Sequence, residues 1–293
     1  MMKKKNSFIE TLIHAGRSVI APSHGEKQTN QPLPPESPEQ ALTRQIPDLI
    51  YDDRFLLYVQ PVVDLKDGSI VGGEVLSRLD HPERGLVFPD KFLPAIEEAG
   101  LCSRFDYYIF RKSCDLVRRL SAQGVEVQYL SCNFSRMTLS EKGIAERLSK
   151  IADECGVTHD HLAVEITERE QETDEEQFKQ NIHQLKEAGF RIFVDDLGAG
   201  VTSVKDLCSY PVDVTKLDRS MLLATETEQG RIVFRSLRNL SVDLGYKVLC
   251  EGVETEEQHQ FVLDTGCDYC QGYLFYRPVE EARFMELVGC KAR

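Results

Sequence analysis

The sequence predicts an α/β protein whose strands close into a (β/α)₈ barrel. Short apolar runs alternate about eight times with longer segments of helical periodicity from residue 56 onward. Polar residues follow the C-terminal ends of these runs, which is where barrel enzymes carry their chemistry. A chain of 293 residues with 41% hydrophobic residues can bury such a core. An open doubly wound sheet is the alternative, but its glycine-rich phosphate-binding fingerprint is missing.

The N-terminal segment differs in composition from the rest of the chain. It includes the polar, proline-rich stretch "HGEKQTNQPLPPESPEQ", a composition typical of linkers. We therefore expect residues 1–46 to be a short disordered leader and residues 47–293 to form the folded domain.

The strands and helices of the domain are predicted from the length and period of each apolar segment. The strand candidates are Leu56–Val63, Ile70–Leu76, Val127–Phe134, Leu162–Ile166, Arg191–Val194, Val214–Leu217, Lys247–Cys250 and a weak Tyr269–Gln271. The helix candidates are Phe105–Ala122, Leu139–Glu154, Glu175–Glu187, Gln229–Leu244 and Glu256–Thr265. Asp174 and Thr255 precede acidic first turns and are the predicted N-caps.

Seven polar residues stand at the C-terminal ends of successive apolar runs. They are Glu74, Asn133, Glu165, Asp195, Asp196, Asp218 and Glu251. The pair Asp195 and Asp196 ends the apolar run in "RIFVDDLGAG", and that stretch alone favours an Asx-type turn. The repetition of acids at one end of successive strands reverses this preference, because all those ends open on one face of a barrel.

Carboxylates and an amide oxygen without histidine or cysteine form a hard oxygen site, which favours Mg²⁺ or Mn²⁺ over zinc. Adjacent aspartates can seat two ions, and two ions can hold a phosphodiester and lower the pKa of a water molecule. Lys216 and Asp218 lie two residues apart and face one side of their strand. Lys216 either orients the attacking water or forms an ion pair with one of the acids, and the sequence leaves these two roles equally open.

The net charge and the cysteine content limit the cellular location and the partners that the sequence predicts. The formal net charge of −13 argues against binding to duplex DNA or RNA and to anionic membranes. No apolar run approaches the ~20 residues that a membrane span requires. The odd number of cysteines, 9, without a signal peptide predicts reduced thiols in a cytoplasmic protein. Cys267 and Cys270 are expected to be core thiols and not a redox or zinc motif.

Seven ordered motifs resemble one family. They are "GGEVLSRLDHPERGLVFPDKFLPAIEEAG", "LSCNFSR", "VEITERE", "VDDLGAGVTS", "PVDVTKLDRS", "CEGVETEEQ" and "QGYLFYRPV". Their order and spacing are similar to those of the EAL family of cyclic di-GMP phosphodiesterases over residues 50–290. The resemblance implies a TIM-like barrel whose first strand is antiparallel. It also implies hydrolysis of cyclic di-GMP to linear pGpG with two metal ions, and a homodimer.

The resemblance also implies roles for individual residues. The family's metal ligands match Glu74, Asn133, Glu165, Asp195 and Asp196, and Asp195 would serve both ions. Lys216 would contact the hydrolytic water, Glu251 would be the general base, and Glu168 would brace the loop that begins at Asp196. Positions that contact the nucleotide or support the site match Gln60, Leu76, Arg78, Asp218, Glu254 and Gln271.

Some residues depart from the family pattern. Leu197, Ala199 and Val201 replace the usual phenylalanine, threonine and aromatic residue of the loop that couples dimerisation to metal binding. Leu79 replaces a common tryptophan, which would thin a contact with one guanine. The alternative function is therefore a cyclic di-GMP receptor or protein-interaction module with little or no turnover. A regulatory partner is expected in either case, whereas a diguanylate cyclase is disfavoured because Val75 replaces the second acid of the cyclase turn.

Overall fold

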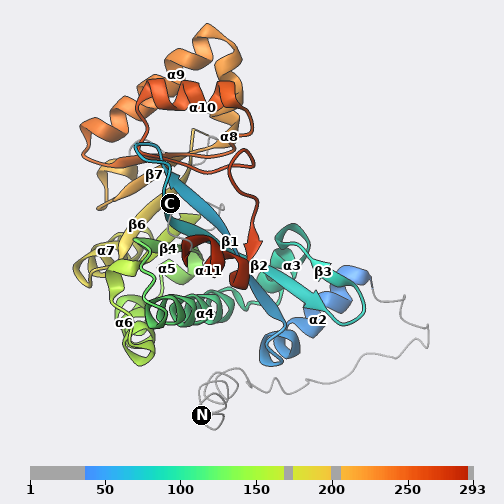
Figure 1. Ribbon diagram of the computed structural model, residues 1–293. Coiled ribbons are helices and arrows are strands. Elements are labelled where there is room, and N and C mark those ends of the chain that lie inside the picture. The colour runs from blue at the N-terminus through green and yellow to red at the C-terminus, as the bar shows by residue number, and fades with distance from the viewer. Residues whose placement is uncertain (1–36, 168–173, 199–205, 290–293) are drawn as a thin grey trace, which may run out of the picture.

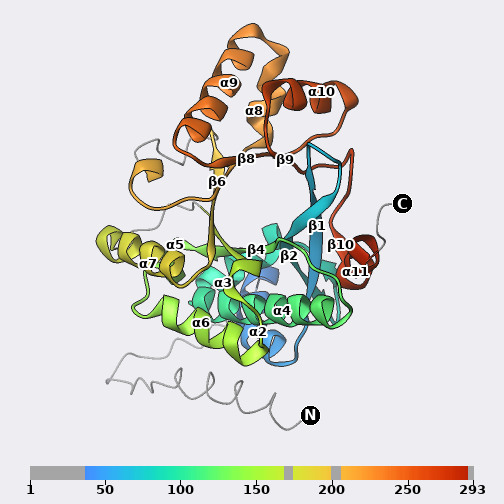
Figure 2. The ribbon, with the colours of Figure 1, turned by 60° about the vertical axis from the view of Figure 1, so that its left-hand side comes forward.

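The computed structural model describes residues 37–167, 174–198 and 206–289, and these contain a closed eight-stranded barrel (Figures 1 and 2). The barrel strands are β1 (Phe55–Asp64), β2 (Ile70–His81), β4 (Tyr129–Ser135), β5 (Leu162–Thr167), β6 (Arg191–Leu197), β7 (Val214–Leu217), β8 (Lys247–Cys250) and β9 (Tyr269–Cys270). Two short strands, β3 (Gly85–Val87) and β10 (Val279–Glu280), pair with β2 and β1. The predicted barrel is confirmed.

Strand β1 runs antiparallel to both of its barrel neighbours. It pairs with β2 through a register that places Gln60 opposite Glu74, and with β9 through Val63 opposite Cys270. All other neighbouring barrel strands, from β2 through β9, are parallel. The expected antiparallel first strand is therefore present, and it closes the barrel.

Helices follow most strands and pack on the outside of the barrel (Figure 2). They are α2 (Pro38–Tyr51), α3 (Pro89–Glu98), α4 (Cys102–Ala122), α5 (Arg136–Leu139), α6 (Ile144–Cys155), α7 (Glu175–Glu187), α8 (Arg219–Leu223), α9 (Glu228–Asp243), α10 (Glu256–Thr265) and α11 (Glu281–Gly289), with 3₁₀ turns η1 (His159–His161), η2 (Asp206–Cys208) and η3 (Ala224–Glu226). Asp174 and Thr255 cap α7 and α10 by accepting hydrogen bonds from the backbone N–H groups of Gln177 and Gln258.

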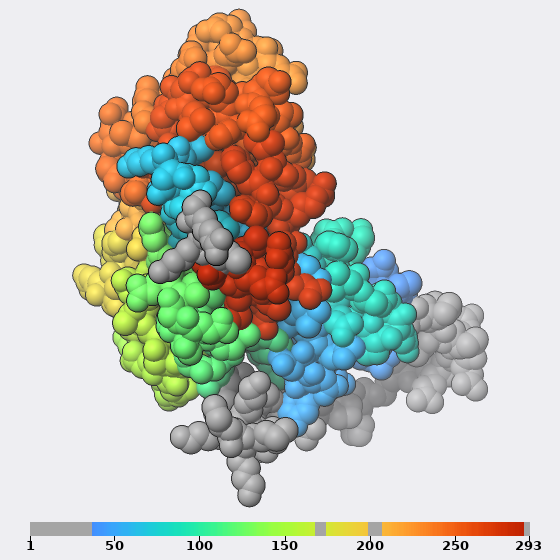
Figure 3. Space-filling model, viewed as in Figure 1, coloured from blue at the N-terminus to red at the C-terminus, as the bar shows by residue number. Residues whose placement is uncertain are grey.

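The predicted boundary of the leader at residue 46 is wrong. Helix α2 begins at Pro38 behind a capping box formed by Ser37 and Gln40. Its buried face consists of Leu42, Ile46, Leu49 and Ile50, and the helix packs on α3 (Figure 3). The proline-rich composition before residue 38 hid this helical periodicity. Residues 1–36 lie outside the described residues.

One predicted helix begins later in the structure than expected. The helix predicted over Leu139–Glu154 is α6, which begins at Ile144 because Gly143 before it has a left-handed conformation with φ of 74°, and Leu139 is the last residue of the separate short helix α5. Glycine adopts this conformation without the steric penalty of a Cβ atom. Helices α2, α3, α8 and α11 have no counterpart among the predicted elements. None of the helices in the described part of the chain is both long and apolar enough to cross a membrane.

The barrel interior contains an apolar layer to which each barrel strand contributes one residue: Val62, Val71, Tyr129, Ala163, Phe193, Val214, Leu249 and Tyr269. Side chains two residues apart on a strand share one face. On the five consecutive strands β5 to β9, the residue two positions further toward the C-terminus is charged or an amide: Glu165, Asp195, Lys216, Glu251 and Gln271. The alternation of the strands therefore places a polar layer directly above an apolar floor.

Candidate active site

Lys216 lies at the centre of the polar layer. Its side chain is 1% exposed, so an unpaired ammonium here would be costly. Its Nζ atom pairs with Glu165 Oε1 at 2.5 Å, Glu251 Oε1 at 2.6 Å, Asp195 Oδ1 at 3.2 Å and Glu74 Oε2 at 3.3 Å. Four carboxylates from four different strands or strand ends thus converge on one atom.

The protonation of Lys216 follows from this surrounding. Burial alone would lower the pKa of Lys216, but the carboxylates of Asp195, Glu165, Glu251 and Glu74 raise it well above its ordinary value. Lys216 is therefore protonated and positively charged as long as no other cation occupies the polar layer. Both roles that the sequence left open remain compatible with this position, because an ion-paired ammonium can also contact a water molecule.

Glu74 is held from three sides. Its Oε1 accepts a hydrogen bond from Asn133 Nδ2 at 3.0 Å, and its Oε2 accepts one from Gln271 Nε2 at 3.0 Å. Burial acts to raise the pKa of Glu74, but Lys216 and these two donors outweigh it and lower the pKa below its ordinary value. Glu74 is therefore a carboxylate at neutral pH.

Glu165 is fully buried and less well satisfied. Burial and the charges of Glu74 and Asp195 raise its pKa well above the ordinary value, against the opposing effect of Lys216. Its Oε2 atom, like Oε1 of Gln271, is buried without a hydrogen-bond partner among the described residues. Such oxygens are rare in native proteins, and a bound cation is one explanation for them.

Asp195 and Asp196 end β6 in an irregular backbone. The pairing of β6 with β7 shifts register between Val194 and Leu197, and Asp196 has a positive φ of 54°. A non-glycine residue in this region costs about 1–3 kcal/mol and is found mainly at functional sites. Gly198 follows with φ of 101°, and a Cβ atom there would lie 2.6 Å from Met221. The chain must therefore turn at glycine directly behind the aspartates.

The ionised forms of Asp196 and Glu251 are destabilised in the folded protein. Burial raises the pKa of Asp196 to about 6, and the charges of Asp195 and Asp218 add to this effect. Burial also raises the pKa of Glu251 to about 8, with further contributions from Asp195 and Glu74 and opposition from Lys216. Both groups would gain from a nearby cation.

The donor set fits divalent cations. Asp195, Asp196 and Glu251 each offer an oxygen, and these atoms lie within 4.8 Å of one another. The five carboxylates and one ammonium of the layer carry a formal charge of −4 when all are ionised, which two divalent cations would neutralise. Oxygen ligands of this kind suit Mg²⁺ or Mn²⁺.

The remaining predicted residues lie around this centre with other contacts. Asp218 caps α8, accepting a hydrogen bond from Ser220 N–H at 2.9 Å. Glu254 is exposed and pairs with Arg219 at 3.0 Å, so the structure does not bring it into the carboxylate cluster. Gln60 donates to the carbonyl of Tyr276 at 3.1 Å. Glu168 lies outside the described residues.

Leu76 and Arg78 share one face of β2, beside the site. Arg78 is 8% exposed, and its guanidinium lies near the rings of Tyr58 and Phe88. The sequence analysis did not single out these two aromatic residues, although "GLVFP" places an aromatic residue directly before a helix-starting proline. Leu79 is fully buried in the hydrophobic core, and the effect of this replacement on a guanine contact stays a prediction.

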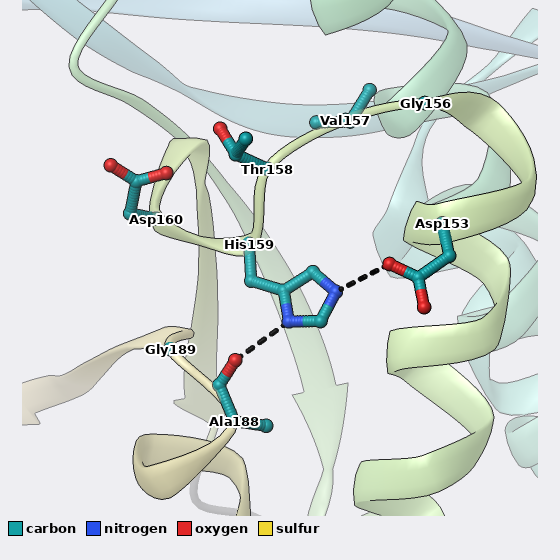
Figure 4. A pocket seen from close by; sticks show the side chains of 8 residues that line it. All are labelled: Asp153, Gly156, Val157, Thr158, His159, Asp160, Ala188 and Gly189. Atoms are coloured by element: carbon teal, nitrogen blue, oxygen red, sulfur yellow. Dashed lines mark hydrogen bonds and ion pairs between the residues drawn. The ribbon is translucent and has the colours of Figure 1, made fainter.

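A separate cavity of about 510 Å³ lies at the opposite end of the barrel. Its lining comes from the turn before β5 and the turn before β6, and it includes His159 (Figure 4). His159 Nδ1 lies 2.6 Å from the carbonyl of Ala188, and Nε2 lies 3.2 Å from Asp153. The N-terminal ends of barrel strands usually serve stability, so we do not place the active site here.

The sequence and the architecture match a known family. The model of the EAL domain matches residues 43–278. The chain belongs to the EAL domain family. Among curated relatives from Pseudomonas aeruginosa, the cyclic di-GMP phosphodiesterase RocR is 32% identical over 79% of this chain and 59% of its own length. The cyclic di-GMP phosphodiesterase NbdA is 29% identical over 85% of this chain and 32% of its own length. The chain thus spans less than two thirds of these relatives.

Solved structures agree with this assignment. The PaMucR phosphodiesterase in complex with cyclic di-GMP has a TM-score of 0.77 at 26% identity, and the match covers 83% of this chain and 99% of that chain. The EAL domain protein from Listeria monocytogenes EGD-e has a TM-score of 0.72 at 29% identity, covering 83% and 96% of the two chains. The EAL family fold predicted from the seven motifs is therefore established.

Proposed function

We propose that this protein is a metal-dependent phosphodiesterase that hydrolyses cyclic di-GMP to linear pGpG. The observation that carries the proposal is the convergence of Glu74, Glu165, Asp195 and Glu251 around Lys216 at the carboxyl ends of the barrel strands. Family membership and the activities named for RocR and NbdA support the substrate.

Two cations, Mg²⁺ or Mn²⁺, are part of the proposal. Glu74, Asn133, Glu165 and Asp195 would hold the first, and Asp195 and Asp196 with Glu251 the second. When bound, such ions neutralise phosphate charge and lower the pKa of water. The partnerless Oε2 of Glu165 and the raised pKa of Asp196 support their presence, because a cation would satisfy the first oxygen and stabilise the ionised form of the second group.

The reaction consumes one water molecule. The water oxygen forms a bond to phosphorus, the bond between phosphorus and the 3′ oxygen breaks, and the phosphate stays on the 5′ oxygen of pGpG. Glu251 would accept a proton from the attacking water, and a proton would be delivered to the departing 3′ oxygen. A carboxylate whose pKa is raised toward neutrality suits this exchange. Lys216, 2.6 Å from Glu251, would orient that carboxylate and the water.

The surrounding residues would position the dinucleotide. Arg78, Gln60 and Leu76 lie beside the site and would contact it, while Gln271 and Asp218 would hold the acids and the adjoining helix in place. Glu168 and Glu254 retain their proposed supporting roles. A homodimer, a regulatory partner and a cytoplasmic location remain predictions of the sequence.

One observation favours a second function, that of a receptor without turnover. Lys216 Nζ occupies the space between the same oxygens that would hold metal. An ammonium that stays there competes with cations for Glu165 and Asp195, whereas a nucleotide can still bind beside Arg78. Binding and hydrolysis must therefore be measured separately.

The decisive assay is anion-exchange chromatography of cyclic di-GMP after incubation with the purified protein in Mg²⁺, Mn²⁺, Ca²⁺ or EDTA. We expect pGpG to appear with Mg²⁺ or Mn²⁺ and to be absent in EDTA. Tight binding by equilibrium dialysis with no pGpG under either metal would reject the enzyme and favour the receptor.

A further inference from the structure

Arg78 is a nearly buried cation with an unusual set of neighbours. Its Cζ atom lies 4.9 Å from the ring centroid of Phe88 and 5.4 Å from that of Tyr58. Nη1 donates to the carbonyl of Ser77 at 2.8 Å. No carboxylate lies within ion-pair distance of Arg78 in the part of the chain that the structure describes. The remaining N–H groups of its guanidinium are therefore available to an anionic or polar ligand.

The two rings approach from opposite neighbours of β2. Tyr58 belongs to β1, and its hydroxyl donates to Glu280 Oε1 on β10 at 3.1 Å, which fixes the ring. Phe88 stands between β3, which pairs with the other edge of β2, and the start of α3. Strand β2 pairs with β1 on one edge and with β3 on the other. The guanidinium is thus held between rings supplied by two different elements.

This arrangement limits how Arg78 can recognise a ligand. Two rings lie close to the guanidinium carbon, and the N–H groups that do not bond to Ser77 are the part that can bind a ligand. An edge of parallel N–H groups suits two acceptors in one plane, such as two phosphate oxygens or the O6 and N7 atoms of guanine. Both acceptor pairs occur in cyclic di-GMP.

We propose that Phe88 is a substrate-positioning residue that acts through Arg78 by clamping its guanidinium against Tyr58. This inference rests on the proposed function for the identity of the ligand. Phe88 is 51% exposed, so its ring is not retained by the core. Cation–π contacts of this kind contribute enough to fix a flexible arginine before the ligand arrives.

The test compares three variants in dissociation constant, KM and kcat for cyclic di-GMP. For Phe88→Ala we expect the dissociation constant and KM to rise about threefold to thirtyfold while kcat changes less than about twofold. Phe88→Tyr should restore near wild-type values, because it supplies a similar ring. Leu86→Ala is the matched control, since Leu86 is 42% exposed on the adjoining β3. Circular dichroism melts confirm that each variant folds.

A double-mutant cycle with Arg78→Lys tests whether Phe88 acts on the ligand through Arg78. We expect Phe88→Ala to add little in the Arg78→Lys background. A full effect there would show that Phe88 contacts the ligand directly and would overturn the proposal, as would unchanged binding by Phe88→Ala. Cyclic di-AMP distinguishes the two possible acceptors, because it has the same phosphates but no guanine O6. If Phe88→Ala does not weaken the binding of cyclic di-AMP, Arg78 binds guanine. If Phe88→Ala weakens it as it weakens the binding of cyclic di-GMP, Arg78 binds phosphate.

Failure of the proposed function gives a different pattern. If the wild-type protein binds cyclic di-GMP without hydrolysing it, the proposed phosphodiesterase activity is wrong. The dissociation constants of the variants then still test whether Phe88 positions Arg78. If the wild-type protein neither binds nor hydrolyses the dinucleotide, both proposals are wrong.

Discussion

The two ends of the barrel differ in what they bury. At the carboxyl ends of the strands, Lys216 and its four carboxylates are packed into a layer with excess negative charge. Aromatic rings pack below this layer and at the opposite end: the ring centroids of Tyr129 and Phe193 in the apolar layer are 4.8 Å apart, and His159 at the opposite end stacks on Phe190 with centroids 4.5 Å apart. The first end opposes folding through repulsion and strain, whereas the second stabilises it through packing. The charged groups of the candidate active site and the aromatic packing that stabilises the fold are thus separated along the barrel axis.

Among the variants that test this difference between the two ends, Glu251→Gln is expected to have the largest effect on activity. Glutamine is nearly isosteric and can still accept a hydrogen bond from Lys216, but it cannot take a proton from water. Turnover of cyclic di-GMP should fall by about 100-fold or more while the dissociation constant stays within a few-fold. Chromatography of pGpG and equilibrium dialysis measure the two quantities. Near wild-type turnover would remove Glu251 from the role of base.

Asp195→Asn should have the next largest effect, on metal affinity. The substitution removes the charge that both proposed ions share. We expect the Mg²⁺ or Mn²⁺ concentration for half-maximal activity to rise about tenfold or more. Glu254→Gln is the control, since Glu254 pairs with Arg219 at the exposed rim. An unchanged metal dependence for Asp195→Asn would contradict the shared position of this aspartate.

A smaller effect is expected on the pH dependence of the free energy of unfolding, and its direction follows from the pKa shifts. Glu251 and Asp196 have folded-state pKa values of about 8 and about 6, above their ordinary values of 4.5 and 3.8. Between about pH 4 and pH 8 the native state keeps protons that the unfolded chain has released. The contribution of these groups to the free energy of unfolding is therefore present at low pH and lost as pH rises through the folded-state values.

Thermal melts in EDTA from pH 5 to pH 8 test this sign. Glu251→Gln cannot titrate at position 251, so its melting temperature should decline less steeply with pH than that of the wild-type protein. Adding Mg²⁺ should restore wild-type stability at pH 8, because cations replace the missing protons as counter-charge. Parallel declines in the two proteins would show that Glu251 is not destabilised as an anion.

The smallest effect on activity is expected at the aromatic end. His159→Ala removes the stack on Phe190 and the contacts with Ala188 and Asp153. The free energy of unfolding should fall by about 1–2 kcal/mol, with turnover unchanged at a temperature where the variant is folded. Urea denaturation and the pGpG assay measure these. A large loss of turnover in the folded variant would break the separation between the two ends.

The sequence predicted the strands best where the apolar runs are β-branched and short. Val214–Leu217 and Lys247–Cys250 agree with β7 and β8 at both ends. It also predicted that the acids lie at one end of the barrel, because each acid follows the C-terminal end of an apolar run and those ends open on one face. Helix α2 was missed because a proline-rich stretch precedes it, and the break at Gly143 was missed because one glycine does not disrupt the helical period.

Some features of the site depend on distances that no linear pattern contains. The sequence allowed Lys216 one acidic partner, whereas the barrel brings four carboxylates to it. The positive φ of Asp196 occurs where the pairing of β6 with β7 shifts register, and this pairing cannot be read from the local sequence. Phe88 reaches Arg78 only because β3 turns back along β2. These are tertiary effects on residues whose local sequence is ordinary.

The most direct test of the account is anomalous diffraction from crystals of this protein grown with Mn²⁺. The account predicts two anomalous peaks at the carboxyl ends of the strands, bounded by Glu74, Asn133, Glu165, Asp195 and Asp196, with Lys216 Nζ moved away from Glu165. Absence of Mn²⁺ from this layer, with Lys216 still paired to its four carboxylates, would contradict it.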